Sequence, residues 1–450
     1  MRDLKEKCAV VGVFGVKGAA KIAYLGLYAM QHRGQEATGL SVSDGEKIST
    51  IKNRGLVSMV YDEPMMDKLD GEIAIGHNRY STAGEDSILD AQPVYARYSL
   101  GEMAIAHNGN FTNALEVRKA LIDDGAIFGS SMDTENLIHL IAKSKESLLR
   151  LRILDALRQV EGAYSLLFLS RTKLFAARDP NGFRPLSIAK IGDGYMVASE
   201  TCAFDLAGAT FERDIEPGEM VIFENGKKPE SIRFAKSDPK HCIFEHVYFA
   251  RPDSFLFGES VYAVRKELGR FLWEEDPIDA DMVIPVPDSS IPHAIGYSQA
   301  SGLPFELGII RNHYIGRTFI EPLQEIRDLK VKKKLSPIKE LIHGKRLVIV
   351  DDSIVRGTTS KKIVSLLKEA GAKEVHMRIA SPAITFPCYY GIDTPHQNEL
   401  ISHRMSSDEI RAYLKADSLR FLSIEALKKS VQNCDNFCLS CFDGRYFHNI

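Results

Sequence analysis

The stretch Arg346-Leu-Val-Ile-Val-Asp-Asp-Ser-Ile-Val-Arg-Gly-Thr-Thr-Ser-Lys-Lys362 decides the fold of the second half of the chain. Its apolar run 347–350 is mostly β-branched, which is typical of a strand buried on both faces of a parallel sheet. Two adjacent carboxylates, Asp351 and Asp352, end the run, and a short polar loop separates them from residues with helical spacing. A second strand-like stretch, 375–379, follows. We therefore predict strand, loop, helix and strand, as in an α/β fold.

The loop in this stretch has the chemistry of an anion site. Backbone N–H groups at the start of a helix carry partial positive charge and bind phosphate. Gly357 lets the backbone approach an anion closely, and three hydroxyls add donors: Thr358, Thr359 and Ser360. Carboxylates just above such a cradle suit a ribose diol or a Mg²⁺ ion that bridges to a second anion. A sugar with a phosphate at one end and a pyrophosphate at the other fits this layout.

This strand end does not match a Walker loop, because no Gly-x4-Gly-Lys-Ser/Thr pattern follows the strand. A generic strand end with acidic caps is the alternative. The stretch resembles the phosphoribosyl-pyrophosphate (PRPP) motif of type I phosphoribosyltransferases. This resemblance implies that PRPP is bound by Asp351, Asp352, Arg356, Gly357, Thr358, Thr359 and Ser360.

Two further segments belong to the same predicted domain. Residues 281–290 read as a strand ending in polar residues, and 305–310 as another strand. Ser289 could reach the same Mg²⁺ as Asp351 and Asp352, although a plain turn residue is an equal alternative. The basic run 327–334 is either a solvated face or a mobile flap that closes on pyrophosphate and excludes water; in the second case Lys333 binds PRPP.

Composition describes an ordinary globular protein. The 450 residues are 44% hydrophobic and 26% charged, with a formal net charge of −3. This balance gives no bulk attraction to nucleic acid or a membrane, and no apolar run reaches the roughly 18 residues that span a bilayer. The first seven residues lack the apolar core of a signal peptide, so we expect a cytoplasmic protein. An odd count of seven cysteines favours metal binding or catalysis over a disulfide framework.

Cys8 precedes the apolar run 9–15, which reads as a buried strand. In isolation, such a cysteine is most simply explained by packing. A cysteine at a processed N-terminus, however, supplies both a nucleophile and a base, since its α-amino group has a pKa of about 8. The leader 1–7 would then have to be removed.

Three later segments offer the other groups that hydrolysis of a glutamine amide needs. Arg79 follows a strand-like run and could hold a carboxylate bidentately. Asn108 and Gly109 offer a side-chain amide and a close backbone N–H as oxyanion donors. Asp133 could take the α-ammonium of the substrate, or could simply be a helix N-cap.

Together these segments resemble the N-terminal-nucleophile (Ntn) glutaminase domain of class II amidotransferases, an αββα fold. The resemblance also includes 31–39, Gly162-Ala-Tyr-Ser165 and 177–185. It implies Cys8 as nucleophile, Arg79 for the substrate carboxylate, Asn108 and Gly109 as oxyanion hole and Asp133 for the substrate amine. Ala9 departs from the glycine usual after the cysteine.

A polar stretch at 236–240 suggests the domain boundary. We predict a cleaved leader at 1–7, a glutaminase domain at 8–236 and a phosphoribosyltransferase domain with a metal-binding tail at 241–450. The combination, with Tyr248-Phe-Ala-Arg-Pro-Asp-Ser254, resembles the glutamine PRPP amidotransferase family. This resemblance implies transfer of ammonia from glutamine to C1 of PRPP, which gives 5-phosphoribosylamine, glutamate and pyrophosphate in the first committed step of purine synthesis.

The resemblance carries further expectations about assembly and regulation. It implies a homotetramer, inhibition by purine nucleotides and no nucleic-acid or membrane partner. Two alternatives remain open at this point: another class II amidotransferase, as in glucosamine-phosphate or asparagine synthesis, and a non-catalytic regulator that senses PRPP or purines.

Four cysteines form a candidate metal site. Cys438 and Cys441 form a Cys-x2-Cys pair, and Cys242 and Cys388 are remote in sequence. Four thiolates suit zinc or an iron–sulfur cluster, and spacing does not decide between them. The resemblance favours the branch of the family that carries a 4Fe–4S cluster, with a structural role. Cys434 is a near alternative to Cys438.

Overall fold

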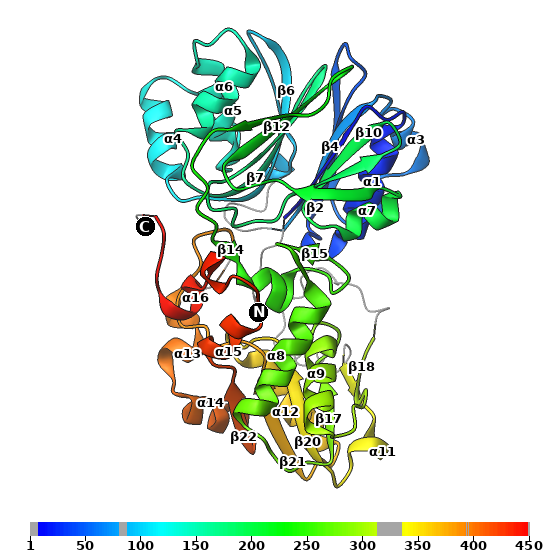
Figure 1. Ribbon diagram of the computed structural model, residues 1–450, viewed down its shortest axis with the longest axis vertical. Coiled ribbons are helices and arrows are strands. Elements are labelled where there is room, and N and C mark those ends of the chain that lie inside the picture. Colours follow the sequence, from blue (N-terminus) through cyan, green and yellow to red (C-terminus); the bar gives the residue numbers. More distant parts are fainter. Residues whose placement is uncertain (1–7, 81–87, 313–334, 393, 395, 449–450) are drawn as a thin grey trace.

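The structure is a computed structural model that describes residues 8–80, 88–312, 335–392, 394 and 396–448. Its N-terminal part contains two antiparallel sheets that face each other (Figure 1). The first sheet has the strand order β11 (Thr210–Asp214), β9 (Ser187–Ile191), β10 (Gly194–Ala198), β1 (Ala9–Phe14), β4 (Ile73–Arg79), β2 (Ala37–Ser43) and β3 (Ile48–Arg54). The second has the order β13 (Glu230–Arg233), β12 (Glu219–Glu224), β8 (Lys173–Arg178), β7 (Gly162–Ser170), β6 (Gly101–Phe111) and β5 (Val94–Tyr98).

Alternation along β1 explains this layering. Val10 and Phe14 belong to the core between the two sheets, whereas Val11 and Val13 face the helices outside. The outer face of the first sheet is covered by α1 (Ala19–Ala29), α2 (Val57–Val60), α3 (Glu63–Met66) and α7 (Cys202–Ala207). The second sheet is covered by α4 (Ala114–Asp123), α5 (Thr134–Lys143) and α6 (Leu149–Leu157). The result is the predicted αββα arrangement.

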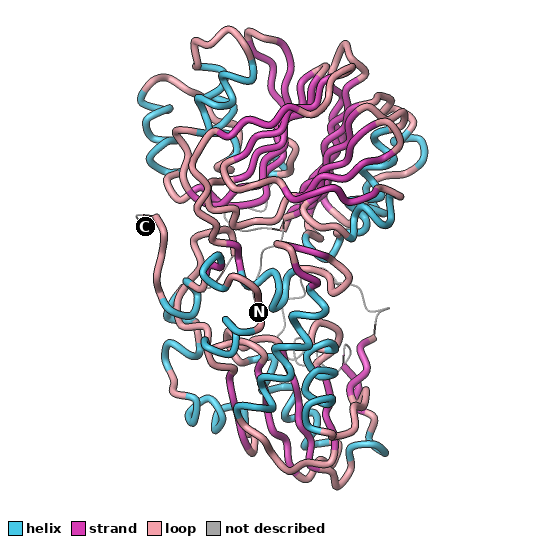
Figure 2. The backbone as a smooth tube through the Cα atoms, in the orientation of Figure 1, coloured by secondary structure: helices cyan, strands magenta, loops and turns pink. Residues whose placement is uncertain are grey.

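The C-terminal part is built on a four-stranded parallel sheet, clearest in the lower half of Figure 2. Its order is β17 (Met282–Pro285), β20 (Arg346–Asp351), β21 (Glu374–Ile379) and β22 (Ser418–Phe421). Val348 and Val350 pack with α8 (Val261–Glu275) and α9 (Ile291–Ser301) on one face. Leu347 and Ile349 pack with α12 (Thr358–Glu369) and α14 (Ser407–Leu414) on the other. Burial on both faces explains why this strand reads as a continuous apolar run.

Shorter elements complete the C-terminal part. They are β14 (His241–Cys242), the π-helix η3 (Glu245–Phe249), β15 (Phe255–Leu256), β16 (Glu259–Ser260), β18 (Ile309–Arg311), β19 (Leu335–Pro337), α11 (Lys339–Ile342), α13 (Ile401–Arg404), α15 (Ile424–Lys429), β23 (Phe437–Cys438) and α16 (Ser440–Asp443). Within the described residues, none of the helices is both long and apolar enough to cross a membrane.

One predicted strand is wrong in its extent. The stretch 305–310 makes only a single bridge, between Phe305 and Val283, before β18 begins at Ile309. Pro304 and Glu306 both bond to the backbone of Val283, but Gly308 already accepts a 2.9 Å bond from the N–H of Ile338. The chain has therefore turned from β17 to the β18–β19 pair before the predicted strand ends.

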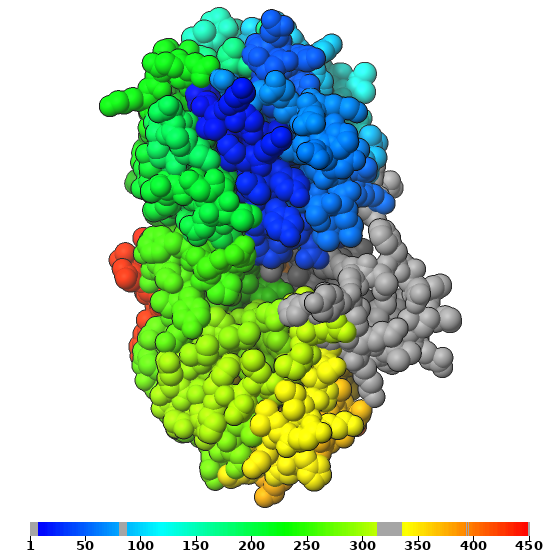
Figure 3. All heavy atoms as spheres, turned by 90° about the vertical axis from the view of Figure 1, so that its right-hand side faces the viewer, coloured from blue at the N-terminus to red at the C-terminus, as the bar shows by residue number. Residues whose placement is uncertain are grey.

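The two parts stack along the long axis of the molecule. Figure 3 shows blue N-terminal residues in contact with green residues of the C-terminal part. The contact also involves buried charges from both parts: Arg33 and Arg184 above and Glu245 below. The sites described next lie on either side of this contact region.

Candidate active sites

Cys8 lies immediately before β1, a central strand of the first sheet. Its thiol Sγ is 3.9 Å from the carbonyl oxygen of Tyr80, at the end of the neighbouring strand β4. Its own carbonyl oxygen accepts a 3.0 Å hydrogen bond from Nε of Arg33. The thiol is partly exposed, so the predicted nucleophile is held in place but reachable.

The predicted oxyanion donors lie on β6, in the opposite sheet. Asn108 Nδ2 is 3.5 Å from the hydroxyl of Ser199, which also accepts a 3.0 Å bond from the N–H of Val10 in the nucleophile strand. Gly109 has φ +150°, and a Cβ there would lie 2.0 Å from the carbonyl oxygen of Ala163. Only glycine fits this close approach, which explains the residue type without reference to catalysis.

Arg79 is the last residue of β4 and is nearly buried. Its Nη2 is 3.5 Å from Oδ2 of Asp90, and Asp90 also accepts bonds of 3.1 and 3.0 Å from the N–H and hydroxyl of Ser131. Asp90 therefore orients the predicted carboxylate-binding arginine. The sequence alone does not reveal Asp90, because it is a lone acidic residue outside every motif.

Asp133 occupies the N-cap position of α5, but its side chain forms no capping bond. Instead, Oδ2 accepts a 3.0 Å bond from the N–H of Phe111, and Oδ1 lies 3.4 Å from Nδ1 of His107. Burial opposes ionisation of Asp133, but His107 and these hydrogen bonds outweigh it and lower the pKa of the carboxyl below its ordinary value. The carboxylate is thus held ionised beside β6, as a group that binds an ammonium must be.

The acidic strand tip of the C-terminal part brings the three predicted Mg²⁺ ligands close together. Asp351 ends β20, and its Oδ1 accepts a 3.0 Å bond from the N–H of Asp352. Asp352 accepts a 2.6 Å bond from the hydroxyl of Ser289 and a 2.7 Å bond from that of Ser353. Ser289, the third predicted Mg²⁺ ligand, therefore touches one of the other two.

The loop after this tip leaves donors without partners. Gly357 has φ +72°, and a Cβ there would lie 2.7 Å from Ile401. The hydroxyl of Thr358 and Nη1 of Arg356 are buried and have no hydrogen-bond partner among the described residues. The other guanidinium nitrogens of Arg356, Nε and Nη2, donate to Glu399 at 3.0 and 2.8 Å. Buried donors without a protein partner are expected where a ligand supplies the acceptor.

The other predicted PRPP residues divide into two groups. Thr359 and Ser360 lie in the first turn of α12, and Ser360 is buried. Lys333 lies outside the described residues, as does the whole basic run 327–334 that we interpret as a flap.

The four predicted metal-binding cysteines converge at the contact between the two parts. Cys242 and Cys438 are opposite each other in the parallel pair β14–β23. The carbonyl oxygen of Cys441 accepts bonds from the N–H groups of residues 385 and 386, just before Cys388. All four thiols are free of disulfides, and Cys242, Cys388 and Cys438 each raise the pKa of Cys441, after the larger effect of burial.

Burial also raises the pKa of Cys438, to about 12, so these thiols stay protonated unless a cation compensates. The alternative ligand Cys434 lies in a 3-10 helix, with its thiol 4.0 Å from Asp435. In the described part of the chain, no group of three or more His, Cys, Asp or Glu side chains has the arrangement of a metal-binding site.

The segment after Cys388 contacts β6, the strand that carries the predicted oxyanion donors. Asn110 Nδ2 donates a 3.0 Å bond to the carbonyl oxygen of Tyr389. A Cβ on Gly391 would lie 3.2 Å from Cα of Gly109. The predicted thiol site and the predicted oxyanion hole are therefore joined by direct backbone contact.

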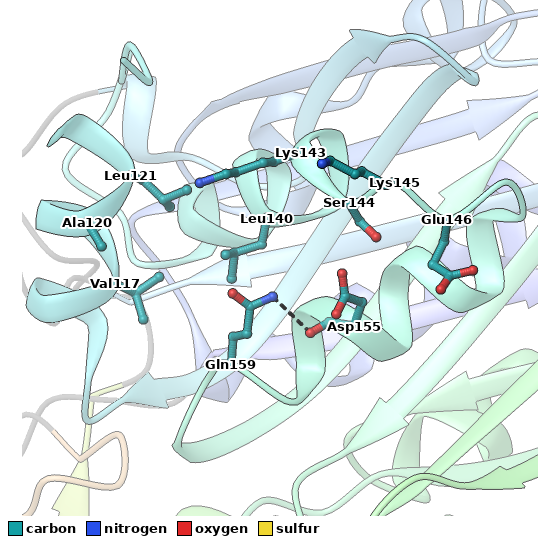
Figure 4. A pocket seen from close by; sticks show the side chains of 10 residues that line it. All are labelled: Val117, Ala120, Leu121, Leu140, Lys143, Ser144, Lys145, Glu146, Asp155 and Gln159. Atoms are coloured by element: carbon teal, nitrogen blue, oxygen red, sulfur yellow. Dashed lines mark hydrogen bonds between the residues drawn. The ribbon is translucent and has the colours of Figure 1, made fainter. Parts of the chain in front are cut away.

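A further pocket lies away from these groups. A cavity of about 470 Å³ lies among α4, α5, the loop after α5 and the end of α6, with Lys143, Lys145, Glu146 and Asp155 among its lining residues (Figure 4). Its lining combines both charge signs with aliphatic groups and includes none of the predicted site residues. It has no part in the chemistry described below.

Comparison with known proteins supports the interpretation of both halves. A model of glutamine amidotransferase domains matches residues 77–205, and a model of phosphoribosyl transferase domains matches residues 259–381. The chain is 53% identical over 446 residues to amidophosphoribosyltransferase 2, chloroplastic, of Arabidopsis thaliana, covering 98% of this chain and 79% of that protein. It is 48% identical over 454 residues to amidophosphoribosyltransferase of Bacillus subtilis (strain 168), covering 99% and 95%. The chain belongs to the amidophosphoribosyltransferase family.

A solved amidophosphoribosyltransferase structure agrees with the fold. The glutamine PRPP amidotransferase of B. subtilis, complexed with ADP and GMP, is 47% identical and superimposes with a TM-score of 0.93, covering 98% of this chain and 97% of that one. The predicted fold class is confirmed: an Ntn glutaminase domain is followed by a phosphoribosyltransferase domain. The roles of individual residues stay predictions.

Proposed function

We propose that this member of the amidophosphoribosyltransferase family transfers ammonia from glutamine to C1 of PRPP, giving 5-phosphoribosylamine, glutamate and pyrophosphate. This is the first committed step of purine synthesis. The observation that carries the proposal is the presence, in one chain, of two features: a thiol at the start of a strand that Ser199 links to Asn108, and an acidic strand tip above a loop with unpartnered donors.

In the glutaminase half-reaction, Arg79 and Asp133 bind the carboxylate and ammonium of glutamine. Cys8 attacks the side-chain amide, assisted by its own α-amino group once the leader 1–7 is removed. Asn108 Nδ2 and the N–H of Gly109 stabilise the oxyanion. Ammonia leaves, and water hydrolyses the thioester to glutamate.

In the second half-reaction, the donors of the loop hold the phosphate of PRPP. The Thr358 hydroxyl and Nη1 of Arg356, both buried without a protein acceptor among the described residues, are positioned to take ligand oxygens. Asp351 and Asp352 orient the ribose, and ammonia attacks C1 as pyrophosphate leaves. Ser289, Asp351 and Asp352 would hold Mg²⁺, which neutralises the pyrophosphate when it is bound.

The cysteine site is proposed to hold a 4Fe–4S cluster, with Cys242, Cys388, Cys438 and Cys441 as ligands. The donor type fits, since four soft thiols from remote parts of the chain gather here and form no disulfide. The group would be structural, because β14 and β23 bring the start and the end of the C-terminal part together here. Iron content and thermal unfolding with and without chelator test this role independently of activity.

The remaining proposals concern processing, boundaries and regulation. We propose domain limits of 8–236 and 241–450, with Lys333 in a flap over pyrophosphate. We also propose regulation by purine nucleotides, a homotetramer and a cytoplasmic location. Replacement of Lys333 by a neutral residue should raise the apparent KM for PRPP; an unchanged KM would remove the flap from the mechanism.

The decisive experiment measures pyrophosphate release by anaerobically purified protein, together with an iron count and the mass of the mature N-terminus. Release should require both PRPP and a nitrogen donor, glutamine or ammonia. Hydrolysis of glutamine with no PRPP-dependent release would point to a different class II amidotransferase. A retained Met1 with neither activity would point to a regulator.

A further inference from the structure

Three sequence motifs that the mechanism does not use converge on one buried group of charges. Arg33 comes from the motif 31–39 and Arg184 from the motif 177–185. They meet Glu245, which lies at the start of η3, in the C-terminal part. Glu200, in the N-terminal part, completes the group and accepts a 2.7 Å bond from Ser254 of the third motif. The side chains of Arg33, Glu200 and Glu245 are fully buried.

The guanidinium of Arg33 is fixed on all of its nitrogens. Nη1 donates to Glu200 at 2.6 Å and to Glu245 at 2.8 Å, Nη2 donates to Glu245 at 2.8 Å, and Nε donates to the carbonyl oxygen of Cys8 at 3.0 Å. Because a guanidinium is rigid and planar, the carboxylate that grips one edge of it sets the direction of the remaining N–H. Glu245 therefore sets the direction of the bond to the predicted nucleophile.

Glu245 is itself held firmly. It accepts a third bond, of 3.1 Å, from Nη1 of Arg184. Arg265 of α8 donates to the carbonyl oxygens of His246 and Ala250, at 2.7 and 2.8 Å, and so fastens η3 to the helices that cover the parallel sheet. Burial lowers the pKa of Arg265 to about 10, while the charge of Asp352 acts in the opposite direction. The helix that carries Glu245 is thus attached to the scaffold of the acidic strand tip.

From this geometry we propose that Glu245, a residue of the phosphoribosyltransferase part, is a positioning residue for the glutaminase nucleophile Cys8, acting through Arg33. The proposal rests on the proposed function and assigns a new role within it. The position of the nucleophile Cys8 then depends on an ion pair between Arg33 and a carboxylate of the other catalytic part.

The expected effect follows from charge. Glu245→Gln leaves Arg33 with one carboxylate, Glu200, which draws the guanidinium towards itself and away from the Cys8 carbonyl. Displacement of a reacting group by about 1 Å costs on the order of 100-fold in rate. The binding groups for glutamine, Arg79 and Asp133, are held by Asp90 and by β6, so substrate affinity should persist.

The test compares full-length wild type, Glu245→Gln and Glu245→Asp with two nitrogen donors. For Glu245→Gln, we expect kcat with glutamine to fall roughly 10- to 100-fold with little change in the glutamine KM. We also expect activity with ammonia, which bypasses Cys8, to stay within about twofold, and alkylation of Cys8 by a diazoketone analogue of glutamine to slow in parallel. Glu245→Asp keeps the charge and should recover part of the rate.

The matched control is Glu219→Gln. Glu219 is also buried and receives bonds of 2.9 and 2.8 Å from a single guanidinium, that of Arg213, but it lies on β12. If Glu219→Gln loses glutamine-dependent activity as selectively as Glu245→Gln, or if Glu245→Gln loses both activities equally, the proposal is overturned.

Two further outcomes are decisive. If Glu245→Gln does not fold, Glu245→Asp is used in its place. A ratio of glutamine-dependent to ammonia-dependent activity equal to that of wild type in Glu245→Asp then refutes the proposal. If wild type lacks both activities, the proposed function fails first, and the alkylation rate of Cys8 alone then decides whether Glu245 positions the thiol.

Discussion

The two candidate sites are built in opposite ways. The PRPP site is one continuous strand tip, loop and helix start, so the residues from Asp351 to Ser360 lie together because they are adjacent in the chain. The glutaminase site gathers residues from just before β1, from β4 and β6, and from the N-cap of α5. Its carboxylate Asp133 already has protein partners, whereas Thr358 in the PRPP loop has none among the described residues. Protein groups therefore already fix the carboxylate Asp133, whereas the loop still offers a donor to a ligand oxygen.

The largest expected effect is a loss of activity with glutamine, but not with ammonia, as the nitrogen donor. Cys8→Ser should lower glutamine-dependent product formation by about 1,000-fold or more, because the nucleophile is lost, and should leave ammonia-dependent formation unchanged. Paired assays with the two donors measure this. Cys202→Ser, at a buried cysteine of α7, is the control and should retain both activities. Equal loss of both activities in Cys8→Ser would contradict the division of labour.

A substitution in the PRPP site should instead lower activity with both nitrogen donors, glutamine and ammonia. Asp352→Asn should lower product formation with either glutamine or ammonia by roughly 100-fold or more, because PRPP loses a carboxylate that orients it. Basal hydrolysis of glutamine should persist. Asp279→Asn, at a largely exposed carboxylate paired with Arg346, serves as the control. Normal product formation by Asp352→Asn would remove the strand tip from the site.

Acid should destabilise the C-terminal part more than the N-terminal part. Burial lowers the pKa of His77 to about 3 and that of His246 to about 4, and it lowers the pKa of His293 well below its ordinary value. The unfolded chain therefore binds more protons than the fold as pH falls from 6.5 towards 4, and stability is lost in that window. At pH 5, His77 and His246 should each cost about 2 kcal/mol, and His246 and His293 lie in the C-terminal part.

The acid experiment has a built-in reporter. Trp273, the single tryptophan, lies in α8. Between pH 7 and pH 5, the denaturant midpoint followed by its fluorescence should fall more than the midpoint followed by amide exchange in β1. His246→Gln should reduce the difference. If both midpoints shift together, the two parts unfold as one unit.

The smallest expected effect tests the unpartnered hydroxyl. Thr358→Val should raise the KM for PRPP roughly 10-fold, because one hydrogen bond to a charged ligand is lost, without lowering the melting temperature. Thr112→Val is the matched control, since the hydroxyl of Thr112 is also buried without a partner among the described residues. It should leave the KM unchanged. An unaltered KM in Thr358→Val would show that this hydroxyl faces no ligand oxygen.

The contrast between the sites also explains what the sequence could predict. The residues after β20 form a contiguous pattern whose geometry follows from strand, turn and helix chemistry. Cys8, taken singly, is better explained by packing, and Asp133 has helix capping as an alternative; the family resemblance joins them. Glu245 escaped prediction because its partner Arg33 is 212 residues away, a pairing that no local period reveals.

The short backbone contact between Gly391 and Gly109 has a consequence for oxidative damage. Cys388 lies three residues before Gly391, and oxidation would add bulky, polar oxygens to its sulfur. Because a Cβ at 391 would already lie 3.2 Å from Cα of Gly109, a displaced segment would push on the strand that carries the oxyanion donors. Oxidation of Cys388 would therefore slow amide hydrolysis, although its sulfur shares neither a bond nor a substrate with that reaction.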